Sequence, residues 1–338
     1  MIILAFESSC DETAAAVVQM DEAKGIRRIL SSAVASQIAV HALYGGVVPE
    51  IASRAHAEAI SGLTDRAMSD AGVSEKEIDA VAVTSTPGLI GPLLVGVNYA
   101  KALAYAWDKP LIAVNHIKGH VAACYPFFPD LKPPFTAMVV SGSHSSLLEV
   151  SSFTDYRALG LTRDDAAGEA FDKVARVLGL PYPGGAEMDR LASLGNPRAI
   201  ALPSVAVPGD TLDFSFSGIK TAVVNYANTL RMKGEPLVPE DLAASFTRAV
   251  TDGVSKRLRE AYDRRPFDRF VLAGGVSANS HLRAAVAAFG KKRRVKVYFA
   301  PPAYCTDNAA MIGVQAYYEA LAGNYAGLDL NPSAVCDI

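Results

Sequence analysis

The sequence lacks both an apolar run that could cross a membrane and an N-terminal run typical of a signal peptide. Its longest apolar stretch, residues 89–107, contains Pro92, Asn98 and Lys101, so it is too short and too polar for a membrane span. The apolar run at the N-terminus ends at Glu7, which is too early for a signal peptide. These absences predict a cytoplasmic protein without a membrane segment.

Cysteine is scarce and shows no pattern. The four cysteines are Cys10, Cys124, Cys305 and Cys336. Their positions match neither the spacing of zinc ligands nor the framework of a disulfide-rich secreted domain. We therefore expect reduced thiols.

The chain also has little net charge. Its formal charge of −3 excludes a surface that is basic throughout, although it allows local basic patches. Two basic runs are candidates for such patches: Arg257, Arg259, Arg264 and Arg265 form one, and Lys291, Lys292, Arg293 and Arg294 form the other. Each run alone is more typical of a solvated turn between a helix and a strand, and it counts as a patch only if another feature points to RNA.

A length of 338 residues, of which 50% are hydrophobic, predicts two domains with large cores. Two hairpins suggest that these domains arose by duplication. In the first, residues 2–6 and 14–18 are apolar and flank ESSCDET, and the second, in residues 135–150, has the small polar tip SGSHSS. We place the domains at residues 1–113 and 114–338, and a helix from about residue 308 is expected to pack back on the first domain.

Between and after the hairpins, strands alternate with helices, which predicts an α/β architecture. Strands are expected at residues 29–38, 80–84, 111–114, 269–273 and 295–300, and helices at residues 51–71 and 242–262.

Two histidines follow the strand at residues 111–114. Asn115 is a good helix N-cap, and His116 and His120 lie four residues apart, so both imidazoles share one helix face. They are either half-buried polar groups or metal ligands. Because a helix N-terminus repels cations, a metal needs an anionic ligand from elsewhere, and Asp307 after the last strand is the best-placed candidate. Two imidazoles and a carboxylate suit zinc or ferrous iron.

Gly274 and Gly275 separate a strand from a helix, where backbone amides suit a phosphate or ribose and Asn279 offers a side-chain contact. A glycine pair also serves ordinary turns. Together with the two hairpins, however, it matches the duplicated two-domain actin-like fold (ASKHA, ribonuclease H-like), which holds a nucleotide in a cleft between its domains. This is the fold class that we predict.

A series of motifs in one order gives the chain a family resemblance. They are ESSCDET, YGGVVPEIASRAH, NHIKGH, DDAAGEAFDK, LGLPYPGG, FSFSGIKT, LAGGVSAN and CTDNAAM, and they extend from residue 1 to about residue 315. With these motifs the sequence resembles the TsaD family of tRNA threonylcarbamoyladenosine transferases, once described as O-sialoglycoprotein endopeptidases.

The resemblance implies transfer of the threonylcarbamoyl group from L-threonylcarbamoyl-AMP to N6 of adenosine 37 in tRNAs reading ANN codons, with release of AMP. It implies that His116, His120 and Asp307 bind one divalent metal ion, iron or zinc. The nucleotide-contacting positions that it implies are Val139, Val140, Ser141, Gly142, Ser143, Asp172, Gly185, Asp189 and Asn279. The implied partners are a smaller paralogous actin-like subunit (TsaB type) and, in bacteria, an ATPase subunit (TsaE type).

Two loops depart from the family pattern. Ser143 and Ser145 replace a glycine and a threonine in the second hairpin, and Thr86 and Pro92 stand where a glycine and a small residue are usual. The Cβ of Ser143 is expected to tighten or reorient its loop. These departures leave open a specialised paralogue of the transferase.

The proposed reaction needs a proton acceptor, because an exocyclic amine is a weak nucleophile. Asp11 or Glu12 at the tip of the first hairpin is our hypothesis for that acceptor. The alternative is that these carboxylates only orient the hairpin or its neighbours.

Three other functions compete. A zinc peptidase is disfavoured, because such enzymes place glutamate directly after the first histidine and this chain has Ile117 there. An actin-like ATPase or small-molecule kinase would release ADP, whereas the transferase releases AMP. A non-catalytic subunit of the kind that pairs with the family lacks the two histidines and the aspartate.

Overall fold

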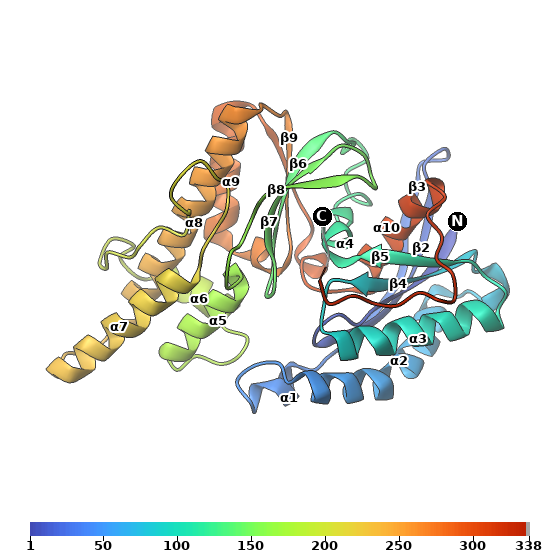
Figure 1. Cartoon of the computed structure of the whole chain (residues 1–338), viewed down its shortest axis with the longest axis horizontal. Coiled ribbons are helices and arrows are strands. Elements are labelled where there is room, and N and C mark those ends of the chain that lie inside the picture. The colour runs from blue at the N-terminus through green and yellow to red at the C-terminus, as the bar shows by residue number, and fades with distance from the viewer. Residues whose placement is uncertain (336–338) are drawn as a thin grey trace. The chain divides into compact units, whose positions relative to one another are not determined.

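The structure of the chain is a computed structural model that describes residues 1–335, and it forms two compact units (Figure 1). The first unit comprises residues 1–133, residues 151–156 and the segment from Ala300 onward. The second comprises Pro134–Val150 and Arg157–Phe299. Each unit is built on a five-stranded mixed sheet.

The first sheet has the order β3-β2-β1-β4-β5. Its strands are β1 (Ile2–Glu7), β2 (Glu12–Asp21), β3 (Ile26–Ser36), β4 (Ala80–Thr86) and β5 (Leu111–Asn115). The helices of this unit are α1 (Ile38–Ala42), α2 (Pro49–Ala71), α3 (Ile90–Ala106), α4 (His116–Ala122) and α10 (Ala309–Leu321), with short 3-10 turns η1 (Glu75–Glu77) and η3 (Pro302–Tyr304).

Both faces of this sheet are covered, which explains why β1 is apolar almost without interruption. Leu4 and Phe6 share a core with residues of α2 and α3, and the alternate residues face α10. Helix α10 lies close to the strands because it carries Gly313, where a Cβ would come within 2.8 Å of the Val18 side chain and 3.2 Å of Ala5. The centre of the sheet is therefore fully buried.

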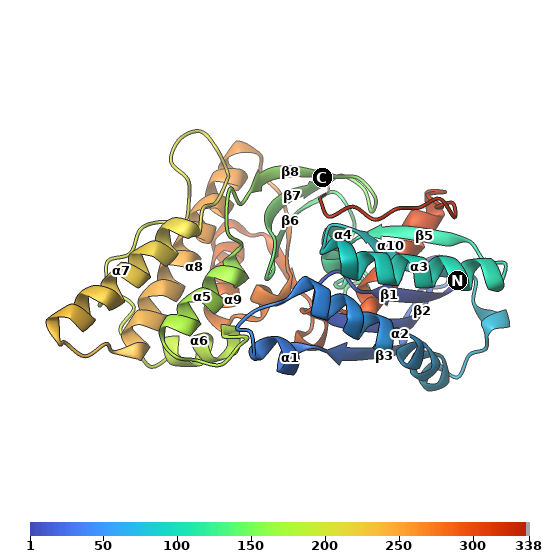
Figure 2. The ribbon, with the colours of Figure 1, turned by 60° about the horizontal axis from the view of Figure 1, so that its bottom comes forward.

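The second sheet has the order β10-β9-β6-β7-β8. Its strands are β6 (Phe135–Val140), β7 (Ser145–Val150), β8 (Tyr156–Leu161), β9 (Arg269–Ala273) and β10 (Lys296–Phe299). The helices are α5 (Ala167–Val177), α6 (Gly185–Ala192), α7 (Ser217–Lys233), α8 (Pro239–Arg264) and α9 (Ser280–Arg293), with the 3-10 turn η2 (Gly275–Ala278). Figures 1 and 2 show these helices gathered beside the sheet, and their apolar faces form one core with Met138, Val140 and Phe270.

The two sheets share one topology. In each sheet, two consecutive strands form an antiparallel hairpin, β1–β2 or β6–β7. The first strand of the hairpin also pairs in parallel with a later strand, β4 or β9. A second parallel strand, β5 or β10, then extends the sheet. The predicted duplication of an α/β unit is confirmed by this repeated order.

The units do not divide where the sequence placed the boundary. The boundary was predicted between residues 113 and 114, but residues 114–133 belong to the first unit. The reason is physical, because α4 continues directly from β5 and packs against α10. Helix α10, expected to return to the first domain, contacts β1 and β2.

Cys10, Cys124 and Cys305 are free thiols, as predicted, and Cys336 lies outside the described residues. Within residues 1–335, no helix combines the length and the apolar character that crossing a membrane requires. Strand β8 and helix α7 were not predicted from the sequence.

Helix α7 begins at an anionic cap that comes from a distant part of the second unit. One carboxylate oxygen of Asp164 accepts hydrogen bonds from the N–H groups of Phe216 and Ser217, at 2.7 and 3.2 Å. The other accepts from the hydroxyls of Ser215 and Ser217, each at 2.5 Å. Burial alone would raise the pKa of Asp164, but these hydrogen bonds lower it below its usual value.

We predict that Asp164→Ala lowers the free energy of unfolding by about 1–2 kcal/mol at pH 7, the usual cost of losing a helix cap. Because the folded pKa is the lower one, this stabilisation exists above about pH 4 and is lost as the pH falls through the folded pKa. Urea unfolding at pH 7 and below pH 4 measures both effects. The exposed Asp210, which only pairs with Arg264, gives the control Asp210→Ala, for which a change under about 0.5 kcal/mol is expected.

Candidate active site

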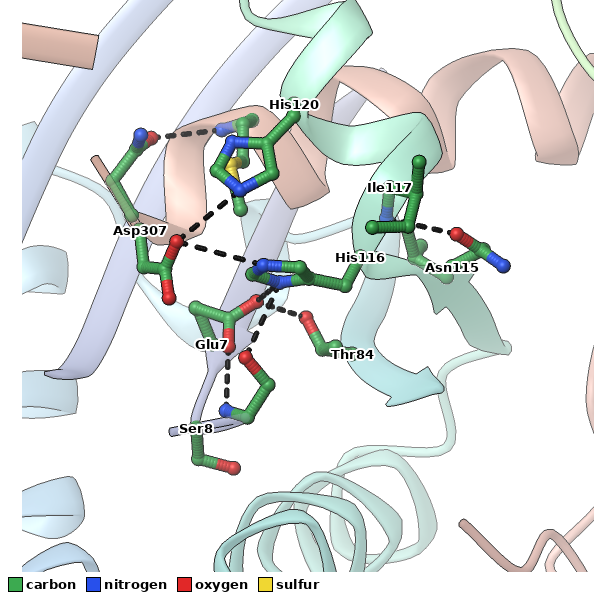
Figure 3. A network of polar contacts seen from close by, with 12 residues as sticks. Glu7, Ser8, Thr84, Asn115, His116, Ile117, His120 and Asp307 are labelled. Atoms are coloured by element: carbon green, nitrogen blue, oxygen red, sulfur yellow. Dashed lines mark hydrogen bonds and ion pairs between the residues drawn. The ribbon is translucent and has the colours of Figure 1, made fainter. Parts of the chain in front are cut away.

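The two histidines of α4 are fixed at the end of a buried strand. The side chain of Asn115 accepts hydrogen bonds from the N–H groups of Ile117 and Lys118 at 2.8 and 3.2 Å, so the helix begins where β5 ends, as predicted. His116 and His120 are 2% and 1% exposed. Both imidazoles lie within the first unit and point toward Asp307 (Figure 3).

Asp307 reaches the histidines from the turn before α10. The helix starts at Asn308, whose side chain accepts a hydrogen bond from Met311 N–H at 3.0 Å. Oδ1 of Asp307 lies 3.5 Å from Nε2 of His116 and 3.3 Å from Nε2 of His120. The structure therefore brings together the three side chains that the sequence singled out, with one potential ligand atom of each within 4.8 Å of the others.

The chemistry of this donor set fits a divalent transition metal. Nδ1 of His120 is buried and makes no hydrogen bond within the described part of the chain, and the buried Nε2 has only the 3.3 Å contact with Asp307, which is not a hydrogen bond of good geometry. Buried polar atoms are rarely left without a partner unless they serve a ligand or ion. Two imidazoles and one carboxylate are a ligand set typical of zinc and ferrous iron.

Glu7 is a functional candidate that the sequence analysis missed. Its fully buried carboxylate lies 3.0 Å from Nδ1 of His116, opposite the nitrogen that faces Asp307. It also accepts hydrogen bonds from Thr84 Oγ1 at 2.5 Å and from Ser9 N–H at 2.6 Å. A carboxylate behind a histidine orients the ring and raises its basicity, one of the common arrangements behind metal-binding histidines.

The charges around His116 shift the pKa values of its neighbours. Burial alone would lower the pKa of His116, but the charges of Asp307 and Glu7 outweigh it and raise the pKa to about 9. Burial would raise the pKa of Glu7, but the attraction of His116 lowers it. Burial and the nearby His116 lower the pKa of His120. Without a cation, the site therefore holds an imidazolium between two carboxylates.

The two candidate proton acceptors lie at the tip of the β1–β2 hairpin, and both are half-buried. Burial, followed by the charges of Asp307 and Asp11, raises the pKa of Glu12 to about 10. Because burial opposes the charged form of Glu12, Glu12 is the poorer of the two candidates for a proton acceptor. The assignment of a base stays a prediction.

His56 of α2 holds the hairpin tip in place. Its Nδ1 lies 2.7 Å from Thr13 Oγ1, and its Nε2 lies 3.0 Å from the carbonyl oxygen of Cys10. Burial lowers the pKa of His56, so the ring is neutral, and both contacts are satisfied when the proton is on Nε2. The sequence analysis quoted His56 in a motif but gave it no role.

The predicted nucleotide-contacting positions all lie in the second unit. Val139 and Val140 end β6, and Ser141 closes the hairpin with a hydrogen bond from its N–H to the carbonyl oxygen of His144 at 2.8 Å. Gly274 adopts a φ of +89°, and a Cβ there would meet the carbonyl oxygen of Val140 at 2.4 Å. This contact brings the turn at Gly275 beside the β6–β7 hairpin.

The remaining positions of this set hold backbone segments together. Asp172 accepts a hydrogen bond from Gly184 N–H at 2.8 Å, directly before Gly185, and Asp189 accepts from Ser280 N–H at 3.1 Å. The side-chain oxygen of Asn279 caps α9 through Leu282 N–H at 2.9 Å. These hydrogen bonds tie the turn at Gly184 to α5 and tie α6 to the start of α9.

The departures from the family pattern cause no backbone strain. Ser143 is exposed, its φ is not in the left-handed region, and its hydroxyl lies 3.1 Å from His144 Nδ1. The carbonyl oxygen of the buried Pro92 accepts a hydrogen bond from Ser8 Oγ at 3.0 Å. Thr86 Oγ1 donates to the carbonyl oxygen of Val335 at 3.3 Å.

Comparison with known proteins agrees with the motifs. The sequence model of the TsaD family, described as tRNA N6-adenosine threonylcarbamoyltransferase, matches residues 28–314. The chain belongs to this family. It is 52% identical over 330 residues to the tRNA N6-adenosine threonylcarbamoyltransferase of Clostridium perfringens, covering 98% of this chain and 96% of that protein. The corresponding Clostridium novyi protein is also 52% identical, over 97% of this chain and 95% of its own length.

Solved structures confirm the actin-like fold that the sequence predicted. A 2-hydroxyglutaryl-CoA dehydratase component A from Acidaminococcus fermentans matches with a TM-score of 0.55 and 14% identity, covering 95% of this chain and 99% of that one. HypF matches with a TM-score of 0.60 and 14% identity over 93% of this chain and 45% of its own. A hexokinase from Thermus thermophilus matches with a TM-score of 0.51 and 15% identity over 96% of this chain and all of its own. At these identities the likeness concerns the fold alone.

We predict that Glu7→Ala lowers the free energy of unfolding by about 3 kcal/mol at pH 7, because it removes the nearer of the two carboxylates that stabilise the buried His116 charge. Urea unfolding in the presence of a chelator measures this loss without a contribution from a bound cation. Glu7→Gln keeps an oxygen for Thr84 or His116 and is expected to lose less. A loss below about 1 kcal/mol for Glu7→Ala would contradict the role assigned to the ion pair.

Proposed function

We propose that this chain transfers a threonylcarbamoyl group to N6 of an adenosine in tRNA. In detail, the donor is L-threonylcarbamoyl-AMP, the acceptor is adenosine 37 of tRNAs reading ANN codons, and AMP is released. Family membership over nearly the whole chain supports this proposal. The observation that carries it is the convergence of His116, His120 and Asp307 on one buried point, with Glu7 behind His116.

In this proposal His116, His120 and Asp307 hold one divalent ion, iron or zinc. Bound there, such an ion supplies a Lewis acid that polarises substrate oxygens. Glu7 holds Nδ1–H of His116 and so directs Nε2 toward Asp307. Thr84 and Ser9 fix Glu7 in turn, which keeps the ligand set in place before substrate arrives.

The amine that attacks must lose a proton, and Asp11 is the acceptor that we favour, with Glu12 as the alternative. The backbone turns at Val139–Ser143 and Gly275 contact the nucleotide part of the donor, and Asp172, Gly185, Asp189 and Asn279 complete that site. A zinc peptidase is not supported, because Ile117 is buried and offers no carboxylate after the first histidine.

The proposal extends to partners and location. We propose that the chain works with a smaller paralogous actin-like subunit of the TsaB type and an ATPase subunit of the TsaE type. A tRNA-modifying enzyme of this kind would act in the cytoplasm.

The function is tested by giving the purified chain threonylcarbamoyl-AMP and unmodified tRNA, with and without the two partners. Modified adenosine in digested tRNA, detected by mass spectrometry, and AMP in the supernatant are expected. Asp307→Asn should lose the bound metal and slow transfer at least about 100-fold, because one of three ligands loses its charge.

Asp252→Asn is the control, since the exposed Asp252 on α8 lies outside both the proposed ligand set and the proposed nucleotide-contacting positions. It should keep the metal content, measured by elemental analysis, and the rate of the wild type. Formation of ADP from ATP with no modified adenosine would instead support the kinase or ATPase alternative.

The proton acceptor is tested by single-turnover transfer with Asp11→Asn and Glu12→Gln. Removal of a general base costs about 10²- to 10⁴-fold in rate, and we expect this loss for Asp11→Asn. Glu12→Gln should have a smaller effect, because burial, the largest influence on Glu12, already disfavours its charged form. Wild-type rates for both variants would exclude both carboxylates as the base.

A further inference from the structure

The last two arginines of each basic run in the sequence line one cavity of the second unit. The cavity has a volume of about 750 Å³. Arg264 and Arg265 reach it from the end of α8, and Arg293 and Arg294 reach it from the end of α9. Arg157 of β8 lines it as well. Helices α8 and α9 pack against each other, which places their basic ends side by side.

Carboxylates in and around the cavity do not balance these arginines. Its lining contains two acidic residues, Glu149 and Asp268, and Arg293 pairs with Asp263 beside it at 3.0 Å. Glu149 is shared by Arg157 and Arg265, so this trio keeps a positive charge. Arg264 pairs with Asp210, whose side chain is 97% exposed, and such pairs contribute little.

Arg294 is the freest of the five arginines. It is exposed and makes no ion pair with any residue between 1 and 335. Its backbone is left-handed, with a φ of 58°, because it ends α9. Its guanidinium is thus available to a ligand.

The wall of the cavity is aromatic. Tyr262 and Phe267 are half-buried lining residues whose ring centroids lie 5.3 Å apart. The guanidinium of Arg293 lies 5.2 Å from the centre of the Tyr262 ring. Arginines beside partly exposed rings are typical of surfaces that bind a nucleic-acid backbone and its bases.

This cavity is separate from the predicted nucleotide site in the same unit. Its lining includes Phe135 and Asp268, at the amino ends of the parallel strands β6 and β9. Val139–Ser143 and Gly275 follow the carboxyl ends of these strands. Nucleotides bind at the carboxyl ends of parallel strands, so the cavity serves a different ligand.

We propose that this cavity binds the phosphodiester backbone of tRNA, at a part of the molecule other than the reacting adenosine. Guanidinium groups suit this ligand, because their planar N–H donors match phosphate oxygens in pairs. The inference rests on the proposed function, which supplies tRNA as the substrate. It adds a contact surface that increases affinity for tRNA and takes no part in the chemistry.

The test is equilibrium binding of fluorescently labelled, unmodified tRNA to the full chain across a range of salt concentrations. Arg264→Gln combined with Arg294→Asn should weaken binding about 10-fold near physiological salt. The slope of log affinity against log salt should fall by roughly 1.4–1.8, the value for two lost phosphate contacts. Asn tolerates the left-handed backbone at position 294.

Arg198→Gln combined with Arg231→Gln is the matched control. Both arginines are exposed, lie in the second unit and are outside the cavity, and the change in net charge is the same. This variant should bind tRNA within about twofold of the wild type. Arg294→Glu is a second variant that changes one exposed side chain, and it should also weaken binding while melting like the wild type.

The outcome separates this inference from the proposed function. Wild-type affinity and salt slope in both cavity variants, with transfer to tRNA intact in the wild type, would overturn the inference alone. A wild-type chain that binds no tRNA at low salt would also overturn it. In the transfer assay the cavity variants should need more tRNA but reach the wild-type rate at saturation, whereas absence of transfer by the wild type would contradict the proposed function.

Discussion

The buried contact between Glu7 and His116 is the interaction on which the rest of the site depends. Glu7 ends β1 and His116 follows β5, and β4 lies between these two strands. Because the three strands are parallel, their carboxyl ends meet at one edge, and Thr84 of β4 bridges the gap through its bond to Glu7. A buried ion pair of this kind is costly unless every partner is fixed. The topology of the sheet, more than any single side chain, therefore builds the site.

The sequence predicted those parts of the fold that short-range patterns encode. The end of β5 at Asn115 and the shared face of His116 and His120 follow from capping and helical spacing, and both were correct. The role of Glu7 was not predicted, because a lone carboxylate after an apolar strand looks like the start of a turn. Its partners, Thr84 and His116, lie 77 and 109 residues further along the chain. Spacing along the chain contains no signal for such a partnership.

The domain boundary was missed for a related reason. Duplication was visible in the two hairpins, but a hairpin marks where a unit begins and not where the preceding one ends. Residues 114–133 stay with the first unit because α4 and α10 pack together, and this contact joins segments almost two hundred residues apart. Asp307 lies just before α10, in the segment from Ala300 onward that belongs to the first unit. The packing that moved the boundary is therefore also the packing that delivers the third side chain to the two histidines.

The sequence left the role of the two basic runs open, and the structure places their last arginines in one cavity. Arginines in the last turns of α8 and α9 have a local explanation, since cations stabilise the negative end of a helix dipole. That explanation covers Arg264 and Arg293 but gives no reason for Arg157, on a strand, to line the same cavity. It also does not explain why Arg265 and Arg157 share one carboxylate. The five arginines face Glu149 and Asp268 in the lining and pair with the exposed Asp210 and Asp263, so a small excess of positive charge remains that an anionic ligand would offset.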